Sequence, residues 1–107
     1  MSKMIGRNQN TSDAAVITTA VIDAITTTTI LAANPKRIAF YVTNNNATDP
    51  VWIKLQAASV DNDKKGIILG KKAEPPKHWD MPSDNIYTGE ISAIADSGTP
   101  TIYVTEY

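Results

Sequence analysis

Hydrophobic and polar residues alternate most regularly in residues 37–43. Ile38, Phe40 and Val42 fall on one side of an extended chain, and the intervening residues, beginning with Arg37, fall on the other. This period of two predicts a half-buried β-strand whose apolar side belongs to a core. An Asn-Pro pair before the segment and three consecutive Asn after it predict a turn at each end.

Seven further segments show either the same alternation or a short run of apolar and β-branched residues. The predicted strands are residues 14–25, 26–31, 51–56, 67–69, 78–81, 91–96 and 101–107. Residues 14–25 also fit a helical stripe, but their β-branched content favours a strand. Ile102 and Val104 are predicted to share the core of Phe40. The segments 37–43 and 51–56 are close enough in sequence to form an antiparallel hairpin.

Short strands separated by frequent turn signals, without a convincing amphipathic helix, predict an all-β fold. We expect an antiparallel β-sandwich, jelly-roll-like, with about eight short strands, because no connection is long enough to carry a crossover helix. Residues 13–107 are predicted to form this single domain. Residues 1–12 are polar and unpatterned, and we expect a flexible N-terminal arm.

Composition supports this fold class and narrows the possible partners. The chain has 107 residues, with thirteen Thr and thirteen Ile, which suit a pleated surface. Ten basic and eleven acidic side chains leave no basic stripe for nucleic acid. The chain contains no cysteine, so a disulfide framework and a thiolate metal site are excluded. No apolar run predicts a membrane segment or a secretory signal, and we expect synthesis in a cytoplasm.

Catalytic and metal-binding motifs are weak. The only histidine, His78, lies in a Pro-rich connector without a recognisable nucleophile, so no catalytic triad is predicted. Asp61, Asn62 and Asp63 match the start of a calcium loop, but lysines follow and no glutamate closes it. We therefore expect no catalytic residue, no metal and no cofactor, and a protein that is not an enzyme.

Aromatic side chains offer a more plausible surface for binding. Trp52 alternates with Val51 and Ile53 and should lie on the opposite side of its strand, where another sheet or a neighbouring subunit must cover it. The residues predicted to form an interface or a ligand surface are Trp52, Tyr41, His78 and Trp79. Aromatic residues in a domain of this size are more often core residues or anchors of a subunit interface than a sugar platform.

Two stretches of the chain, together with a short apolar strand near IILG between them, resemble small virion proteins of tailed bacteriophages. The first is ILAANPKRIAFYVTNNNATDPVWIKL, in which an "ILAANPxR" turn opens a strand ending in "NN". The second is NIYTGEISAIADSGTPTIYVTEY, which fits the closing pattern "IxAIxxSGTxxxxVxE". The resemblance covers about residues 28–107, and the segment 71–79 departs from the shorter, Gly-rich link of that family.

The resemblance implies a phage structural protein, located in the virion, that decorates the outer capsid surface or anchors a head fibre there. Its partner would be the major capsid protein or another virion protein, and we expect a homo-oligomer, preferably a trimer, with no nucleic acid and no membrane. The arm could order on the capsid through its few charged and apolar residues, Lys3, Met4, Ile5 and Arg7. The alternatives are a carbohydrate-binding adhesion module that uses Trp52 or Trp79 to contact a host-surface glycan, and a connector or tail component.

Overall fold

The computed structural model describes residues 15–71, 78–80 and 86–107. These residues form eight β-strands and no helix. The strands are β1 (Val16–Val21), β2 (Thr28–Leu31), β3 (Phe40–Asn44), β4 (Val51–Lys54), β5 (Ile67–Leu69), β6 (His78–Asp80), β7 (Ile91–Ala95) and β8 (Thr101–Glu106). Each lies within a segment for which the sequence predicts a strand, apart from the last residue of β3, and residues 16–21 are a strand and not a helix.

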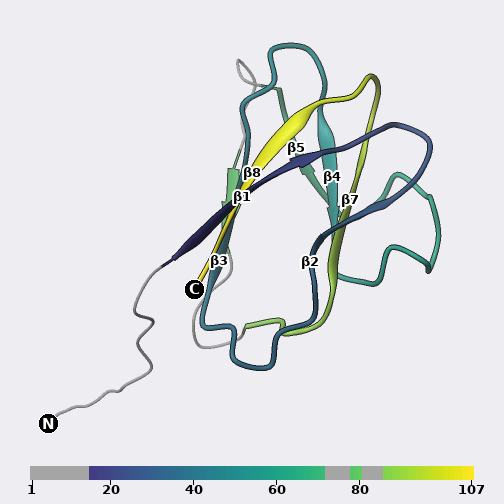
Figure 1. The fold of residues 1–107 in the computed structure, drawn as a ribbon. Helices are drawn as coiled ribbons and strands as arrows, with labels where there is room; N and C mark the ends of the chain where they lie inside the picture. Colours follow the sequence, from purple (N-terminus) through teal and green to yellow (C-terminus); the bar gives the residue numbers. More distant parts are fainter. Residues whose placement is uncertain (1–14, 72–77, 81–85) are drawn as a thin grey trace, which may run out of the picture.

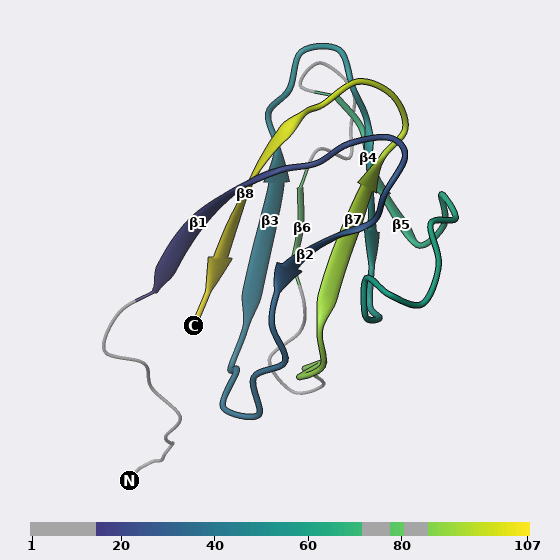
Figure 2. The ribbon, with the colours of Figure 1, turned by 45° about the vertical axis from the view of Figure 1, so that its right-hand side comes forward.

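The strands form two antiparallel sheets that pack face to face (Figures 1 and 2). The first sheet has the order β1-β8-β3-β6 and the second has the order β2-β7-β4-β5. Every connection passes from one sheet to the other except that between β4 and β5, which are neighbours in the second sheet. This strand order is that of an eight-stranded jelly roll. The predicted jelly-roll-like sandwich is therefore confirmed.

The predicted hairpin between residues 37–43 and 51–56 is wrong. β3 pairs with β8 and β6 in the first sheet, whereas β4 pairs with β7 and β5 in the second. The segment between them turns from one sheet to the other, and the Asn44 amide stabilises the turn by donating to the backbone oxygens of Asp49 (2.9 Å) and Gly70 (3.3 Å). In a hairpin the apolar sides of β3 and β4 would lie on one face, whereas in the sandwich they face each other across the core.

The core lies between the sheets and follows the predicted alternation. Phe40, Val42, Ile102 and Val104 are buried on the inner side of the first sheet, as predicted. They pack against inner residues of the second sheet, which include Leu31, Val51, Ile53, Leu69, Ile91, Ala93 and Ala95. Ile38 is only half-buried because β3 begins at Phe40.

Arg37 is buried, contrary to the prediction that it lies on the outward side of the strand. Only 3% of the residue is exposed. Its Nε donates to Glu106 Oε2 (2.7 Å), Nη1 donates to the carbonyl oxygens of Tyr87 (2.7 Å) and Gly89 (3.0 Å), and Nη2 donates to that of Ala32 (2.8 Å). The residue precedes β3, so the two-residue period no longer sets its direction. It ties together three segments at one end of the sandwich.

Candidate functional site

The outer side of the first sheet forms a continuous surface with two exposed tyrosines. The register aligns Thr19 with Tyr103 and Thr43, and Ile17 with Thr105 and Tyr41. We call the eight outward residues of β1, β8 and β3 the tyrosine face: Ile17, Thr19, Val21, Thr101, Tyr103, Thr105, Tyr41 and Thr43. None of the eight is charged.

His78 and Asp80 continue the outer side of the sheet onto β6, where the charged Asp80 lies opposite Tyr41. His78 lies opposite Thr43, and its ring stacks on Tyr41 with a centroid distance of 5.5 Å and an interplanar angle of 20°. Both side chains are exposed. Two of the four aromatic and imidazole residues predicted as an interface or ligand surface therefore lie together. Diagonal neighbours on adjacent strands are within reach of rings of this size.

The two tryptophans lie elsewhere. Trp79 points inward, where its ring makes an edge contact with the Phe40 ring at a centroid distance of 5.3 Å, and it packs against the core as a partly buried residue. Trp52 lies on the outer side of the second sheet between Ile94 and Ile68, opposite the buried Val51 and Ile53. Its indole is half-buried, and Nε1 has no acceptor in the described part of the chain.

The loop between β4 and β5 folds over part of the outer side of the second sheet. Lys54 points from β4 into this cover, and its side chain is 1% exposed. The ammonium donates to Asp61 Oδ1 (2.6 Å), to the Asp61 carbonyl oxygen (3.1 Å) and to Thr27 Oγ1 (3.2 Å). Ser92 Oγ, on β7, donates to the carbonyl oxygen of Gln56 in the same loop (2.9 Å). The loop therefore seals the sheet with satisfied polar contacts.

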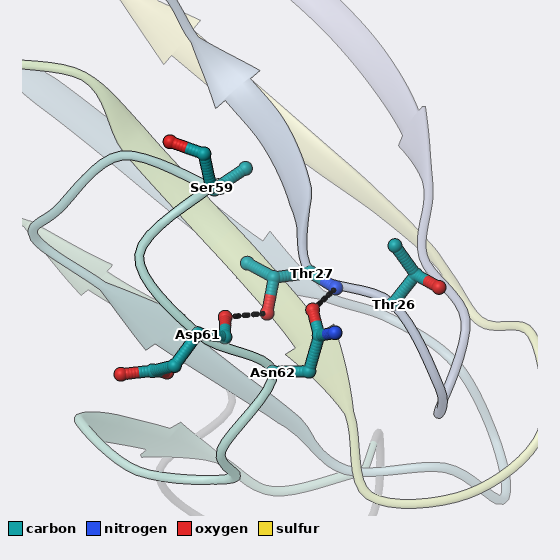
Figure 3. Close-up of a pocket in the computed structure, with 6 residues that line it drawn as sticks. Thr26, Thr27, Ser59, Asp61 and Asn62 are labelled. Atoms are coloured by element: carbon teal, nitrogen blue, oxygen red, sulfur yellow. Dashed lines mark hydrogen bonds between the residues drawn. The ribbon is translucent and has the colours of Figure 1, made fainter.

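A pocket of about 370 Å³ lies where this loop meets the β1–β2 connection (Figure 3). It is lined by Thr26, Thr27, Ala58, Ser59, Asp61 and Asn62. Figure 3 shows Thr27 bound across the pocket wall, with its backbone N donating to Asn62 Oδ1 and its hydroxyl to the Asp61 carbonyl oxygen, both at 2.9 Å. These bonds hold the two segments together, and the lining residues that the structure describes include no aromatic side chain.

The carboxylate of Asp61 is occupied by lysines. Oδ1 accepts from Lys54, and Oδ2 lies 2.8 Å from the ammonium of Lys65. The Lys54 hydrogen bond, and after it that of Lys65, holds the pKa of Asp61 well below its ordinary value. Among residues 15–71, 78–80 and 86–107, no group of three His, Cys, Asp or Glu side chains could hold a metal ion. The Asp-Asn-Asp sequence therefore holds the loop that covers Lys54 in place, through the contacts of Asp61 with Lys54 and of Asn62 with Thr27.

Sequence analysis did not identify Lys54 or Arg37 as organising residues. The alternation of residues 51–56 puts Lys54 on the same side of its strand as Trp52, but it gives no sign that a loop covers this side chain. The predicted arm residues Lys3, Met4, Ile5 and Arg7 lie outside the described residues, as does most of the connector 71–79.

The described residues contain no helix long and apolar enough to cross a membrane. No protein-family model, curated protein or solved structure matches this chain.

Proposed function

We propose that this protein is a non-enzymatic structural component of a tailed bacteriophage, bound to the outer capsid surface as a homo-oligomer, where it decorates the shell or anchors a fibre. The tyrosine face is the observation that supports a role in assembly, because it has the composition of a protein interface. Depletion of charge and enrichment of tyrosine distinguish the centres of protein interfaces from ordinary surface. Among the described residues, the clusters of charged side chains are instead used to hold the fold together.

The jelly roll itself is compatible with this function. Viral capsid proteins use this fold, although lectins and cupins use it as well. A fold alone does not specify a function. The phage assignment rests on the resemblance of residues 28–107, whereas the interface assignment rests on the surface that we describe.

Attachment to the shell is assigned to the arm. A short segment carrying Lys3, Met4, Ile5 and Arg7 has few apolar residues, so one arm would bind weakly. Several arms projecting from one oligomer would bind together, and avidity could exceed single-arm affinity by roughly 10²–10⁴. The capsid surface would thus be recognised by the assembly and not by the monomer.

The test is co-sedimentation with emptied phage particles from which this protein has been removed. Deletion of residues 1–12 should abolish binding and leave the melting temperature of the protein unchanged. A matched control replaces Lys36 and Lys64, two exposed lysines of the sandwich, with Ala. It removes two positive charges, as many as the deletion removes with Lys3 and Arg7. Full occupancy by the deletion variant would disprove attachment through the arm, and failure of the intact protein to bind would disprove the capsid function.

A second candidate is a carbohydrate-binding module, favoured by the stacked Tyr41 and His78 rings. Exposed aromatic faces are suited to the apolar side of a sugar ring. Tyr41→Ala should then abolish retention on a glycan array, whereas Thr105→Ala, on the same face, should not. If the intact protein retains no glycan, this candidate is disproved.

A further inference from the structure

β1 is an edge strand of the first sheet (Figure 2). It pairs with β8, and no other strand in the described part of the chain pairs with it. Five of its six residues are exposed, and Ile17 and Val21 are 71% and 65% exposed. One side of this strand therefore presents backbone hydrogen-bonding groups without a partner strand.

The hydrogen-bonding pattern between β1 and β8 identifies which residues of β1 present backbone groups on the open side. Facing residues of an antiparallel pair alternate between hydrogen-bonded and non-hydrogen-bonded pairs. The nitrogen of Ile22 donates to the carbonyl oxygen of Pro100 at 2.9 Å, and these two residues continue the β1–β8 register. Even-numbered residues of β1 therefore point their backbone groups at β8. Ile17, Thr19 and Val21 point theirs at the open side.

Nothing within β1 protects this open edge. Natural edge strands are usually kept from pairing by a charged residue, a proline or a bulge. The sequence VITTAV contains no charge and no proline, and its register with β8 runs without interruption from Val16 to Val21. The strand is thus suited to pair with another strand.

We propose that the partner is β1 of a second copy of this chain, paired antiparallel about a two-fold axis at Thr19. The open groups lie on odd-numbered residues, so hydrogen-bonded pairs must join odd to odd. Centring the pair on Thr19 places Ile17 of each copy opposite Val21 of the other copy. The two first sheets then become one continuous sheet of eight strands, and apolar β-branched residues face each other at its centre.

A second copy fits this edge better than a charged partner. The tyrosine face, which flanks the edge, has no charge, so two copies can approach without like charges coming together. An isologous contact also covers both edges at once and closes the assembly. The contact would bury less than roughly 1,200 Å² in total, which is typical of association in the micromolar range. A two-fold contact makes a dimer the smallest assembly, and not the trimer that the phage resemblance implies.

This inference rests on the homo-oligomer of the proposed function, but it concerns only self-association and is tested without phage particles. Sedimentation velocity of the full chain at about 1–500 µM should show a monomer–dimer equilibrium. The variant Ile17→Lys/Val21→Lys puts lysine opposite lysine and should weaken dimerisation at least tenfold. The variant Ile17→Lys/Val21→Glu puts lysine opposite glutamate and should restore it.

The charge-swapped pair is specific to this contact. Residues 17 and 21 of one chain are roughly 13 Å apart along the strand, so their side chains cannot pair within a monomer. A control replaces Ile25 and Val60, which are 82% and 60% exposed and lie outside the strands, with lysine. This control should dimerise as the intact protein does. All the substituted side chains are exposed, so melting curves should confirm that each variant folds.

A cysteine at the axis gives an independent readout, since the chain contains no cysteine. Thr19→Cys should form an intermolecular disulfide under mild oxidation, because hydrogen-bonded antiparallel residues lie about 5.5 Å apart between Cα atoms. Ser59→Cys, on the exposed loop, should remain reduced. The proposal is overturned if the intact protein is monomeric throughout, if Ile17→Lys/Val21→Lys dimerises normally, or if Ile17→Lys/Val21→Glu does not recover. Loss of capsid binding with normal dimerisation would count against the proposed function alone.

Discussion

Replacement of Arg37 should be among the most damaging single changes in the sandwich. Its buried guanidinium donates to three backbone carbonyl oxygens and to the carboxylate of Glu106, at distances of 2.7–3.0 Å. It also lies 5.9 Å from the centroid of the Phe40 ring. Arg37→Ala would leave the carbonyl groups without their donors and would open a space beside the core.

The magnitude follows from the cost of removing one partner of a buried ion pair, about 3–5 kcal/mol. The side chain of Glu106 is 21% exposed, so water can hydrate it in part and moderate the loss. A domain of this size has a total stability of about 5–15 kcal/mol. The melting temperature should therefore fall by roughly 12–20 °C, at about 4 °C per kcal/mol. Arg37→Lys should recover little, because one ammonium cannot reach acceptors on three sides.

Urea unfolding followed by tryptophan fluorescence would measure this change. Lys36→Ala, which removes an exposed neighbouring charge, should alter stability by less than about 0.5 kcal/mol. In a double-mutant cycle, Glu106→Gln should cost less in the Arg37→Ala background than in the intact protein. A loss below about 1 kcal/mol for Arg37→Ala, or identical costs of Glu106→Gln in both backgrounds, would refute the reasoning.

Two further predictions concern the core and the covering loop. Phe40→Ala should lower the free energy of unfolding in urea by about 3–5 kcal/mol, because the residue is 1% exposed and its ring packs on Trp79. Thr43→Ala, on the outer face, should lower it far less. Equal losses of stability in the two variants would contradict the fold. The depressed pKa of Asp61 means that its ionised form stabilises the folded state above the ordinary carboxyl pKa of about 4, and that this stability is lost as pH falls below that value. The melting temperature should drop between about pH 5 and 2, and Asp61→Asn should make that drop smaller. Asp63→Asn is the control, because it removes a neighbouring charge. If Asp61→Asn leaves the pH profile unchanged, the contact between Lys54 and Asp61 is not coupled to folding.

The strands could be predicted from the sequence because each of them reports a local property. In Phe40 to Asn44 and in Thr101 to Glu106, alternation of buried and outward residues requires no knowledge of the partner strand. β7 is the exception, since Ile91–Ala95 is buried on both sides. The alternation of polar Ser92 with apolar Ala93 is typical of a half-buried strand, but both residues are buried.

Long-range pairing could not be predicted in the same way. The turn after β3 could have closed a hairpin or passed to the other sheet, and the deciding contact, from Asn44 to Gly70, spans 26 residues. The cover over Lys54 depends similarly on Asp61 and on Thr27, which is 34 residues away from Asp61 along the chain. Periodicity gives the direction of a side chain and not what lies over it.

The two outer sides of the sandwich differ in a way that bears on assembly. The second sheet is partly covered by the β4–β5 loop, which supplies the carboxylate and a carbonyl oxygen that the buried ammonium of Lys54 requires. That cover is satisfied and needs no partner. On the first sheet, Ile17, Val21 and Tyr103 remain exposed on adjacent strands, so they add little to the stability of a monomer. Scattered exposed apolar residues are ordinary, but a contiguous uncharged group beside an unprotected strand edge is typical of an interface. Pairing at β1 would bring Ile17 of each copy against Val21 of the other, and so would cover apolar side chains that the monomer leaves 71% and 65% exposed.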